Sequence, residues 1–213
     1  LTTARIESKS LQLKKERFNL TRAVQEVLTD LEINVQDNYN VGRNNLQLLY
    51  EPGGHNGGVN ANNKNDDNVD NNILVNADKH MILQVITNLV NNAISFTRSG
   101  TISVEVERTG PSNHISNNDN NNHHSNGNSK NYYNNPEAVV KIKDTGSGID
   151  PEILPRLFSK FATKSDHKGT GLGLFISKSI VEAHGGRIWA ENNADGIGAT
   201  FAFSIPIDNP NNK

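Results

Sequence analysis

Three glycines alternate with other residues in the segment Gly169-Thr170-Gly171-Leu172-Gly173, where an amphipathic helix is predicted to begin. The first turn of a helix leaves backbone N–H groups without intrahelical partners and carries the positive end of the helix dipole. Glycine also lacks the Cβ atom that would keep a bound anion at a distance. The segment therefore predicts a phosphate-binding loop, although a lone glycine cluster is weak evidence for one.

A second predicted helix, over residues 78–96, carries an unusual number of asparagines. Its apolar positions are predicted to form one core stripe, made of Ile82, Val85, Leu89, Ala93 and Phe96. A polar ridge borders this stripe at helical spacing and consists of Gln84, Asn88, Asn92 and Ser95. Asparagine is a mediocre helix former, and its amide oxygen is a hard neutral ligand that suits Mg²⁺. The ridge fits either a magnesium site at the edge of a cleft or buried amides that satisfy neighbouring backbone.

A predicted strand over residues 137–143 leads directly into Asp144 and the turn Thr145-Gly146-Ser147-Gly148. An ionised carboxylate only accepts hydrogen bonds, so Asp144 would suit the exocyclic amine of adenine and would repel the carbonyl of guanine. Gly146 and Gly148 would let the backbone approach a flat ring. The same residues also fit an ordinary turn at a strand end.

Composition narrows the class of protein. The 213 residues carry a formal net charge of −2, which gives no indication of a nucleic-acid surface. The chain has no cysteine, and this excludes disulfides and thiolate metal sites. No apolar run approaches the ~20 residues of a membrane span, and the first residues lack a signal-peptide pattern. We therefore expect a soluble, cytoplasmic chain without nucleic-acid or membrane contact.

Two segments, 52–72 and 110–136, are crowded with Asn, Gly, Ser and His and are almost free of large apolar residues. Such segments cannot bury enough surface to offset their ordering entropy, so we predict mobile loop insertions. Each insertion is predicted to interrupt a hairpin. The flanking strands are 45–51 and 73–76 for the first insertion, and 101–108 and 137–143 for the second.

The remaining elements define a fold class. Further strands are predicted at 187–191 and 200–205, and helices at 20–38, 78–96 and 171–184. Helices that alternate with antiparallel hairpins predict an α+β domain. We expect a two-layer sandwich, in which helices cover one face of a mixed, largely antiparallel sheet.

Taken in order, these motifs resemble the catalytic ATP-binding domain of sensor histidine kinases, a member of the GHKL superfamily together with heat-shock chaperones, type II topoisomerases and mismatch-repair ATPases. The resemblance covers about residues 15–207, apart from the two insertions. It implies a Bergerat-type fold, with residues 1–14 as the end of a dimerisation and phosphoacceptor helix plus a linker, and 208–213 as a disordered tail. The matching motifs are NLVNNAISFT at 88–97, DTGSGI at 144–149, LFSKF at 157–161, GTGLGL at 169–174 and GIGATF at 196–201.

The resemblance also implies a role for each matching position. Asn92 would hold Mg²⁺, and Asn88 would lie beside the γ-phosphate of ATP and the incoming nucleophile. Asp144 would accept the adenine amine, with Thr200 supporting adenine through a water. The other residues expected to contact the cofactor are Phe96, Gly146, Gly148, Ile149, Gly169, Thr170, Gly171, Leu172 and Gly173.

One position departs from the family pattern, because Ser95 stands where a Lys or Arg often meets the phosphates. Lys164 and Lys168, in the short predicted lid 162–168, are the candidates to replace that cation, and we place Lys164 with Asn88 as a catalytic candidate. A lysine is a compact point charge for phosphate. Two ordinary solvated lysines would fit the sequence equally well.

The implied reaction is transfer of the ATP γ-phosphate to a histidine on a separate phosphoacceptor domain, for relay to a response regulator. None of the seven histidines lies in a His-Glu/Asp-x-x-x-Pro helix, so we expect the acceptor outside this chain. The resemblance also implies that dimerisation is carried mainly by the helices of the phosphoacceptor domain, so we expect this chain to be monomeric. Whether the parent protein is anchored in a membrane stays open. Two alternatives remain: a nucleotide-binding signalling module without transfer activity, and a related anti-sigma-type serine kinase.

Overall fold

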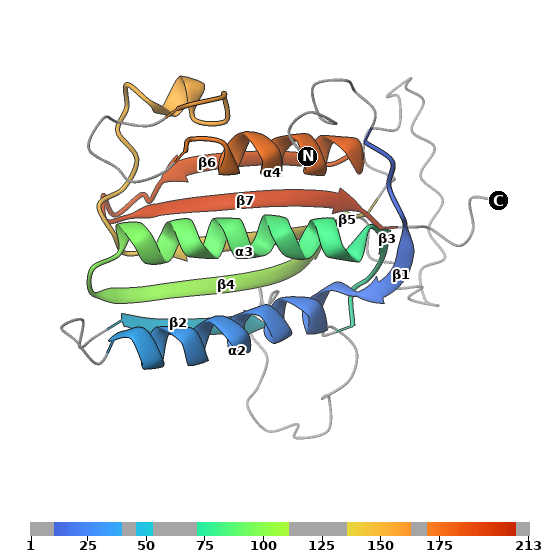
Figure 1. The fold of residues 1–213 in the computed structure, drawn as a ribbon, viewed down its shortest axis with the longest axis horizontal. Coiled ribbons are helices and arrows are strands. Elements are labelled where there is room, and N and C mark those ends of the chain that lie inside the picture. Colours follow the sequence, from blue (N-terminus) through green and yellow to red (C-terminus); the bar gives the residue numbers. More distant parts are fainter. Residues whose placement is uncertain (1–10, 40–45, 53–71, 111–135, 163–169, 208–213) are drawn as a thin grey trace, which may run out of the picture.

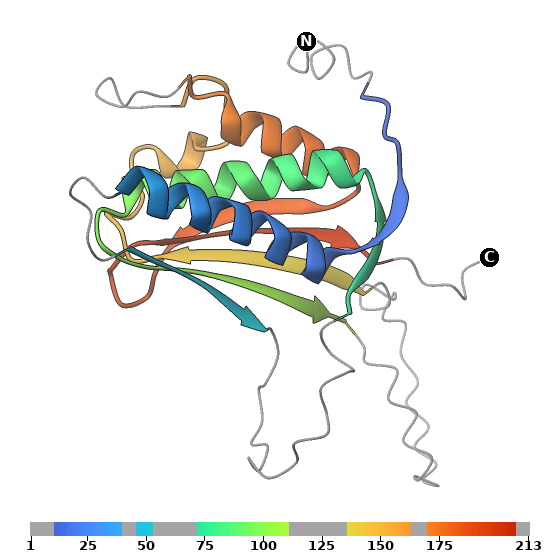
Figure 2. The ribbon, with the colours of Figure 1, turned by 60° about the horizontal axis from the view of Figure 1, so that its bottom comes forward.

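The computed structural model describes residues 11–39, 46–52, 72–110, 136–162 and 170–207. Within these residues, helices lie over one face of a five-stranded sheet, and Figures 1 and 2 show the two layers. The helices are α2 (Leu20–Tyr39), α3 (Lys79–Phe96) and α4 (Gly173–Ala183), with a short 3₁₀ turn at Leu154–Arg156. This arrangement confirms the predicted α+β class.

The sheet is mixed and largely antiparallel, as predicted. Among the strands that the structure describes in this sheet, only the pair β2–β4 is parallel, and the other neighbours run antiparallel. The predicted pairing of 101–108 with 137–143 is confirmed, because β4 and β5 form an antiparallel ladder. In spatial order the strands are β2 (Leu46–Pro52), β4 (Gly100–Thr109), β5 (Glu137–Asp144), β7 (Ala199–Pro206) and β6 (Arg187–Asn192).

The first predicted hairpin is wrong. β2 does not pair with β3 (Leu74–Ala77); β3 instead forms a separate two-stranded antiparallel sheet with β1 (Glu16–Asn19), a strand that no pattern predicted. The physical reason is that alternation of apolar and polar residues indicates a strand but not its partner. The apolar side chains of β3 that must be buried are Val75 and Ala77, and pairing with β1 buries them as well as a hairpin with β2 would.

Polar caps set where the first two helices begin. The Asn19 side chain accepts the Arg22 N–H at 3.0 Å, and the Asp78 carboxylate accepts the Met81 N–H at 3.1 Å. The third helix starts two residues later than predicted, because Gly171 has a φ of 64° and cannot be helical. It ends before Gly185, whose φ of 78° is typical of a helix C-terminus.

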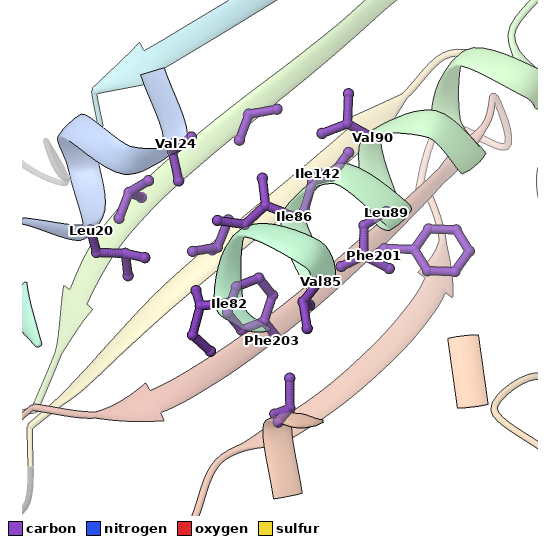
Figure 3. Close-up of a cluster of buried hydrophobic side chains, with 14 of the residues drawn as sticks. Leu20, Val24, Ile82, Val85, Ile86, Leu89, Val90, Ile142, Phe201 and Phe203 are labelled. Atoms are coloured by element: carbon purple, nitrogen blue, oxygen red, sulfur yellow. The ribbon is translucent and has the colours of Figure 1, made fainter. Parts of the chain in front are cut away.

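The core lies between the helices and the sheet, and α3 runs through its centre (Figure 3). Burial of each large aliphatic side chain there stabilises the fold by about 1.5–3 kcal/mol. One member of the predicted stripe is wrong: Phe96, in the last turn of α3, is 43% exposed. The buried residues of α3 are Ile82, Val85, Ile86, Leu89, Val90, Ala93 and Ile94.

Several predictions concern residues that the structure does not describe. The helix end at 1–9, the tail 208–213 and nearly all of the insertions 52–72 and 110–136 lie outside the described ranges. Among the helices that are described, none is both long and apolar enough to cross a bilayer.

Candidate active site

The motifs singled out in the sequence gather at one end of the molecule. The last turn of α3, the end of β5, the start of β7 and the first turn of α4 all lie at this end (Figure 1). The β5–β7 ladder brings Lys143 opposite Thr200, and so places Asp144 next to the turn between β6 and β7. The fold therefore assembles residues that are more than a hundred positions apart in the chain.

Asp144 is a buried carboxylate at the end of β5, only 2% exposed. Its Oδ1 accepts the Gly146 N–H at 2.8 Å. Burial raises the pKa of Asp144, and backbone hydrogen bonds from Gly146 and Ala199 partly oppose that increase. A carboxylate in this setting gains from an additional donor, which is what the amine of an adenine offers.

Gly146 is needed where the turn after β5 passes the end of α3. A Cβ atom at Gly146 would lie 2.5 Å from the backbone oxygen of Phe96. The Ser147 N–H donates to that same oxygen at 3.3 Å. The turn and the end of α3 are therefore in direct backbone contact, so the predicted pair Gly146 and Phe96 is brought together.

Asn192, at the end of β6, holds the other half of this turn, and the sequence patterns did not point to it. Its side-chain oxygen accepts the Ile149 N–H at 2.6 Å, and its amide nitrogen donates to the Ile149 carbonyl at 2.9 Å. Gly148 adopts a φ of 72°, and a Cβ there would lie 2.9 Å from Asn192 Oδ1. The predicted residues Gly148 and Ile149 are therefore fixed by one asparagine.

Asn88 faces the first turn of α4. Its amide nitrogen donates to the hydroxyl of Ser177 at 3.0 Å, and a Cβ at Gly173 would collide with its side-chain amide. A cavity of about 220 Å³ lies between the two helices at this point. Its lining includes Asn91 but not the predicted Asn92; the full set is Gln84, Thr87, Asn88, Asn91, Gly173, Ile176 and Ser177.

Three predicted site residues of α3 lie in line between these two contacts, and we call them the α3 ridge below: Asn88 and Asn92 of the predicted polar ridge, and Phe96 of the predicted core stripe. Asn88, Asn92 and Phe96 follow at intervals of four, so they lie on one side of the helix and span about 12 Å of its axis. Asn88 meets Gly173 at one end, and the Phe96 carbonyl meets the Gly146 turn at the other. Asn92, which is half-buried, lies between a site suited to a purine and a helix start suited to phosphates.

The segment that leads into α4 is held at its base. The Phe161 N–H donates to the Gly171 carbonyl at 3.0 Å, and a Cβ at Gly171 would lie 2.7 Å from Phe161 Cα. Thr170 is exposed and Leu172 is half-buried. Three predicted site residues, Lys164, Lys168 and Gly169, lie outside the described residues.

At the opposite end, His184 ties α4 to α3. The Asp78 N–H donates to His184 Nε2 at 3.0 Å, so the neutral ring carries its proton on Nδ1, which contacts the Ile180 carbonyl at 2.7 Å. Burial lowers the pKa of His184, and the charge of Lys15 adds to this effect. The two helices that carry the site are thus joined far from it.

Comparison of the sequence with known proteins identifies one family and several sensor proteins that are similar to this chain. The model of the family "Histidine kinase-, DNA gyrase B-, and HSP90-like ATPase" matches residues 77–209. The sensor protein FixL of Bradyrhizobium diazoefficiens is 38% identical over 139 residues, which are 65% of this chain and 23% of FixL. The sensor histidine kinase AruS of Pseudomonas aeruginosa is 31% identical over 195 residues, which are 89% of this chain and 15% of AruS. The chain thus spans less than a quarter of the length of these relatives.

Solved structures agree with the fold. The catalytic domain of the histidine kinase ThkA, in a nucleotide-free form, superposes with a TM-score of 0.60 and 28% identity, and the match covers 91% of this chain and 95% of that one. Full-length ShkA in complex with AMPPNP superposes with a TM-score of 0.63 over 96% of this chain and 34% of ShkA. At 18% identity, the likeness to ShkA bears on the fold alone.

Proposed function

Because the chain belongs to the histidine kinase-, DNA gyrase B-, and HSP90-like ATPase family, we propose that it is the catalytic ATP-binding domain of a sensor histidine kinase. It transfers the γ-phosphate of ATP to a histidine on a separate phosphoacceptor domain, from which the phosphoryl group passes to a response regulator. The relatives support this reading, since FixL is a sensor protein and AruS is a sensor histidine kinase. Because ATP is the substrate, the domain works in the cytoplasm.

One observation supports the proposal most strongly: the α3 ridge runs from the turn after the buried carboxylate of Asp144 to the start of α4 at Gly173. Asp144 accepts the adenine amine, and the glycine turn around Gly146 and Gly148 lies against the ring. The N–H groups at the start of α4 face the phosphates, where the helix dipole favours negative charge. Asn88 lies at the γ-phosphate, because it contacts Gly173 directly.

The residues present also suit Mg²⁺. Asn92 offers an amide oxygen on the ridge between the base site and the phosphate site, and Mg²⁺ prefers oxygen ligands while it keeps waters and substrate phosphates. When bound, the ion neutralises charge that develops on the transferred phosphoryl group. Lys164 and Lys168 are proposed to add positive charge there, as the chain has Ser95 where the family often has a cation.

The histidines that the structure describes are poorly placed to accept the phosphoryl group. His184 is buried, and both of its ring nitrogens contact backbone atoms. His80 lies in the first turn of α3, two turns before Asn88 and away from the phosphate end. None of the seven histidines lies in a His-Glu/Asp-x-x-x-Pro motif, so we assign the acceptor to a separate phosphoacceptor domain. We expect this chain to be monomeric, because dimerisation in such kinases is carried mainly by the helices of that other domain.

Isothermal titration calorimetry with MgATP tests this proposal. We expect the wild-type chain to bind MgATP, and Asp144→Ala and Asn92→Ala to weaken binding on the order of tenfold or more. Gln25→Ala, on the exposed side of α2, serves as the control and should bind as wild type does. Radiolabelled ATP and a supplied histidine-helix domain then report transfer. A wild-type chain that takes up no nucleotide at any magnesium concentration would refute the proposal.

A further inference from the structure

Asn193 is a buried amide that makes an unusual number of contacts near Asp144. It lies at the start of the turn between β6 and β7 and is 8% exposed. Its amide nitrogen donates to the Asp144 carbonyl at 2.8 Å and to the Ile197 carbonyl at 2.6 Å. Its side-chain oxygen accepts the hydroxyl of Thr200 at 2.7 Å. An asparagine side chain offers two donors and one acceptor oxygen, and here all three are engaged.

The sheet explains why the Asp144 carbonyl takes a side-chain donor. The β5–β7 ladder ends at the pair Lys143 and Thr200, so Asp144 lies one residue beyond it. Asn193 donates to the Asp144 carbonyl at this point, where the β5–β7 ladder has already ended. The backbone of the turn also packs on this point, because a Cβ at Gly198 would collide with the Asp144 carbonyl.

Asn193 therefore connects the two residues that the proposed function assigns to the base. One of its bonds fixes the backbone of Asp144, whose carboxylate would accept the adenine amine. Another fixes the hydroxyl of Thr200, on the neighbouring strand. Since the amide is rigid and buried, a change at Asn193 alters the relative position of these two groups.

We propose that Asn193 is a positioning residue for base recognition, and that it sets the preference of the site for a purine with a 6-amino group. This inference rests on the proposed function, since it concerns the same nucleotide site. Asn193 itself does not contact the nucleotide. A purely structural role would predict lower stability and equally weaker binding of all nucleotides.

A pair of nucleotides separates the two roles. ATP and purine riboside triphosphate, which lacks the 6-amino group, share their ribose and phosphates, so their affinity ratio reports recognition of the amine alone. We expect wild type to prefer MgATP by about tenfold or more, the value of a hydrogen bond to a charged acceptor. In Asn193→Ala this ratio should fall several-fold, towards one.

Asp195→Ala is the matched control, because Asp195 is exposed in the same turn and its carboxylate accepts the Ile197 N–H at 3.0 Å. It loosens the turn without touching Asp144, so the ratio should stay at the wild-type value. If Asn193→Ala weakens both nucleotides equally and keeps the ratio, the inference is wrong. If wild type binds neither nucleotide, the proposed function itself fails.

An NMR titration of the wild-type protein tests the same inference without requiring that any variant folds. The side-chain amide resonances of Asn193 are followed by ¹⁵N NMR while each nucleotide is titrated. Occupation of the Asp144 carboxylate by the amine should change the Asn193 to Asp144 hydrogen bond, so ATP should shift these resonances more than the analogue does. Equal shifts with both nucleotides would overturn the inference. Asn193→Ser, which keeps one short polar group, gives an intermediate ratio in the binding assay.

Discussion

A single methyl group at Gly173 tests whether Asn88 works at the phosphate end of the site. In Gly173→Ala, the new Cβ atom would overlap the Asn88 side-chain oxygen, and would lie 3.1 Å from Cγ and 3.2 Å from Nδ2. Gly173 is the first residue of α4, so its backbone is fixed by the helix and the flexible partner must move. To reach ordinary van der Waals contact, the Asn88 oxygen has to shift by roughly 1 Å.

The expected effect on stability is small, because two contributions oppose each other. Replacing glycine by alanine in a helix stabilises it by up to about 1 kcal/mol, and by less in the first turn. The shift of Asn88 breaks its 3.0 Å hydrogen bond to Ser177, which contributes about 0.5–1.5 kcal/mol. We therefore expect the free energy of unfolding to change by less than about 1 kcal/mol.

The expected effect on catalysis is large. A misplacement of about 1 Å at a group that positions reacting atoms costs on the order of 10²-fold in rate. The rate of phosphoryl transfer from saturating MgATP to a supplied histidine-helix domain should fall by about that factor in Gly173→Ala. Urea unfolding of the same preparation reports stability, and calorimetry reports the affinity for MgATP.

Ser177→Ala is the informative control, since it removes the hydrogen bond without pushing Asn88 aside. We expect it to lose far less transfer rate than Gly173→Ala does. If Gly173→Ala is as stable as wild type and transfers phosphate at the wild-type rate, then Asn88 does not act at the γ-phosphate, and the proposed orientation of the nucleotide is wrong.

Two further predictions follow from buried ionisable groups. Burial raises the pKa of Asp144, and in the proposed function the ionised form accepts the adenine amine, so MgATP affinity should fall as the pH decreases through this raised pKa. Calorimetry across pH, with purine riboside triphosphate as the reference for phosphate titration, checks this; an identical pH dependence for both nucleotides contradicts it. Burial lowers the pKa of His184 below its ordinary 6.5, so its contribution to stability is full above pH 6.5 and is lost as the pH falls below that value. Urea unfolding at several pH values gives the free energy of unfolding as a function of pH. Below pH 6.5 this free energy should depend less steeply on pH in His184→Gln than in wild type, and an equally steep dependence would count against the neutral ring.

The sequence predicts well those parts of the fold whose determinants are local. The helix α3 is defined by the cap Asp78 and by apolar residues at helical spacing, so its bounds were predicted to within one residue. The pairing of strands is harder to predict from the sequence, because it depends on contacts between distant segments. β2 pairs with β4 in parallel, about fifty positions further along the chain, and β1 is too short to give a pattern.

The same distinction holds for the site. Gly146 and Gly173 stand in contiguous motifs, so their neighbourhoods could be anticipated, and the structure places each beside α3. Asn192 and Asn193 were missed because they bind backbone atoms of residues 43 and 49 positions away. The only local signal was two adjacent amides before the turn at Gly196, which is typical of any loop. Phe96 was assigned to the core by periodicity, which does not register that the helix ends at the edge of the packed layer.

The contacts of α3 explain how the site is held in place. At the start of α3, the Asp78 backbone binds His184 of α4, and the Asp78 carboxylate accepts the Lys14 N–H at 2.9 Å. Midway along, Asn88 meets α4 again at Ser177. These two hydrogen bonds between α3 and α4 fix both the distance between the helices and their relative position along the axis. The α3 ridge and the start of α4 therefore keep one geometry. A site that is ordered in this way has less ordering entropy to lose when it receives a nucleotide.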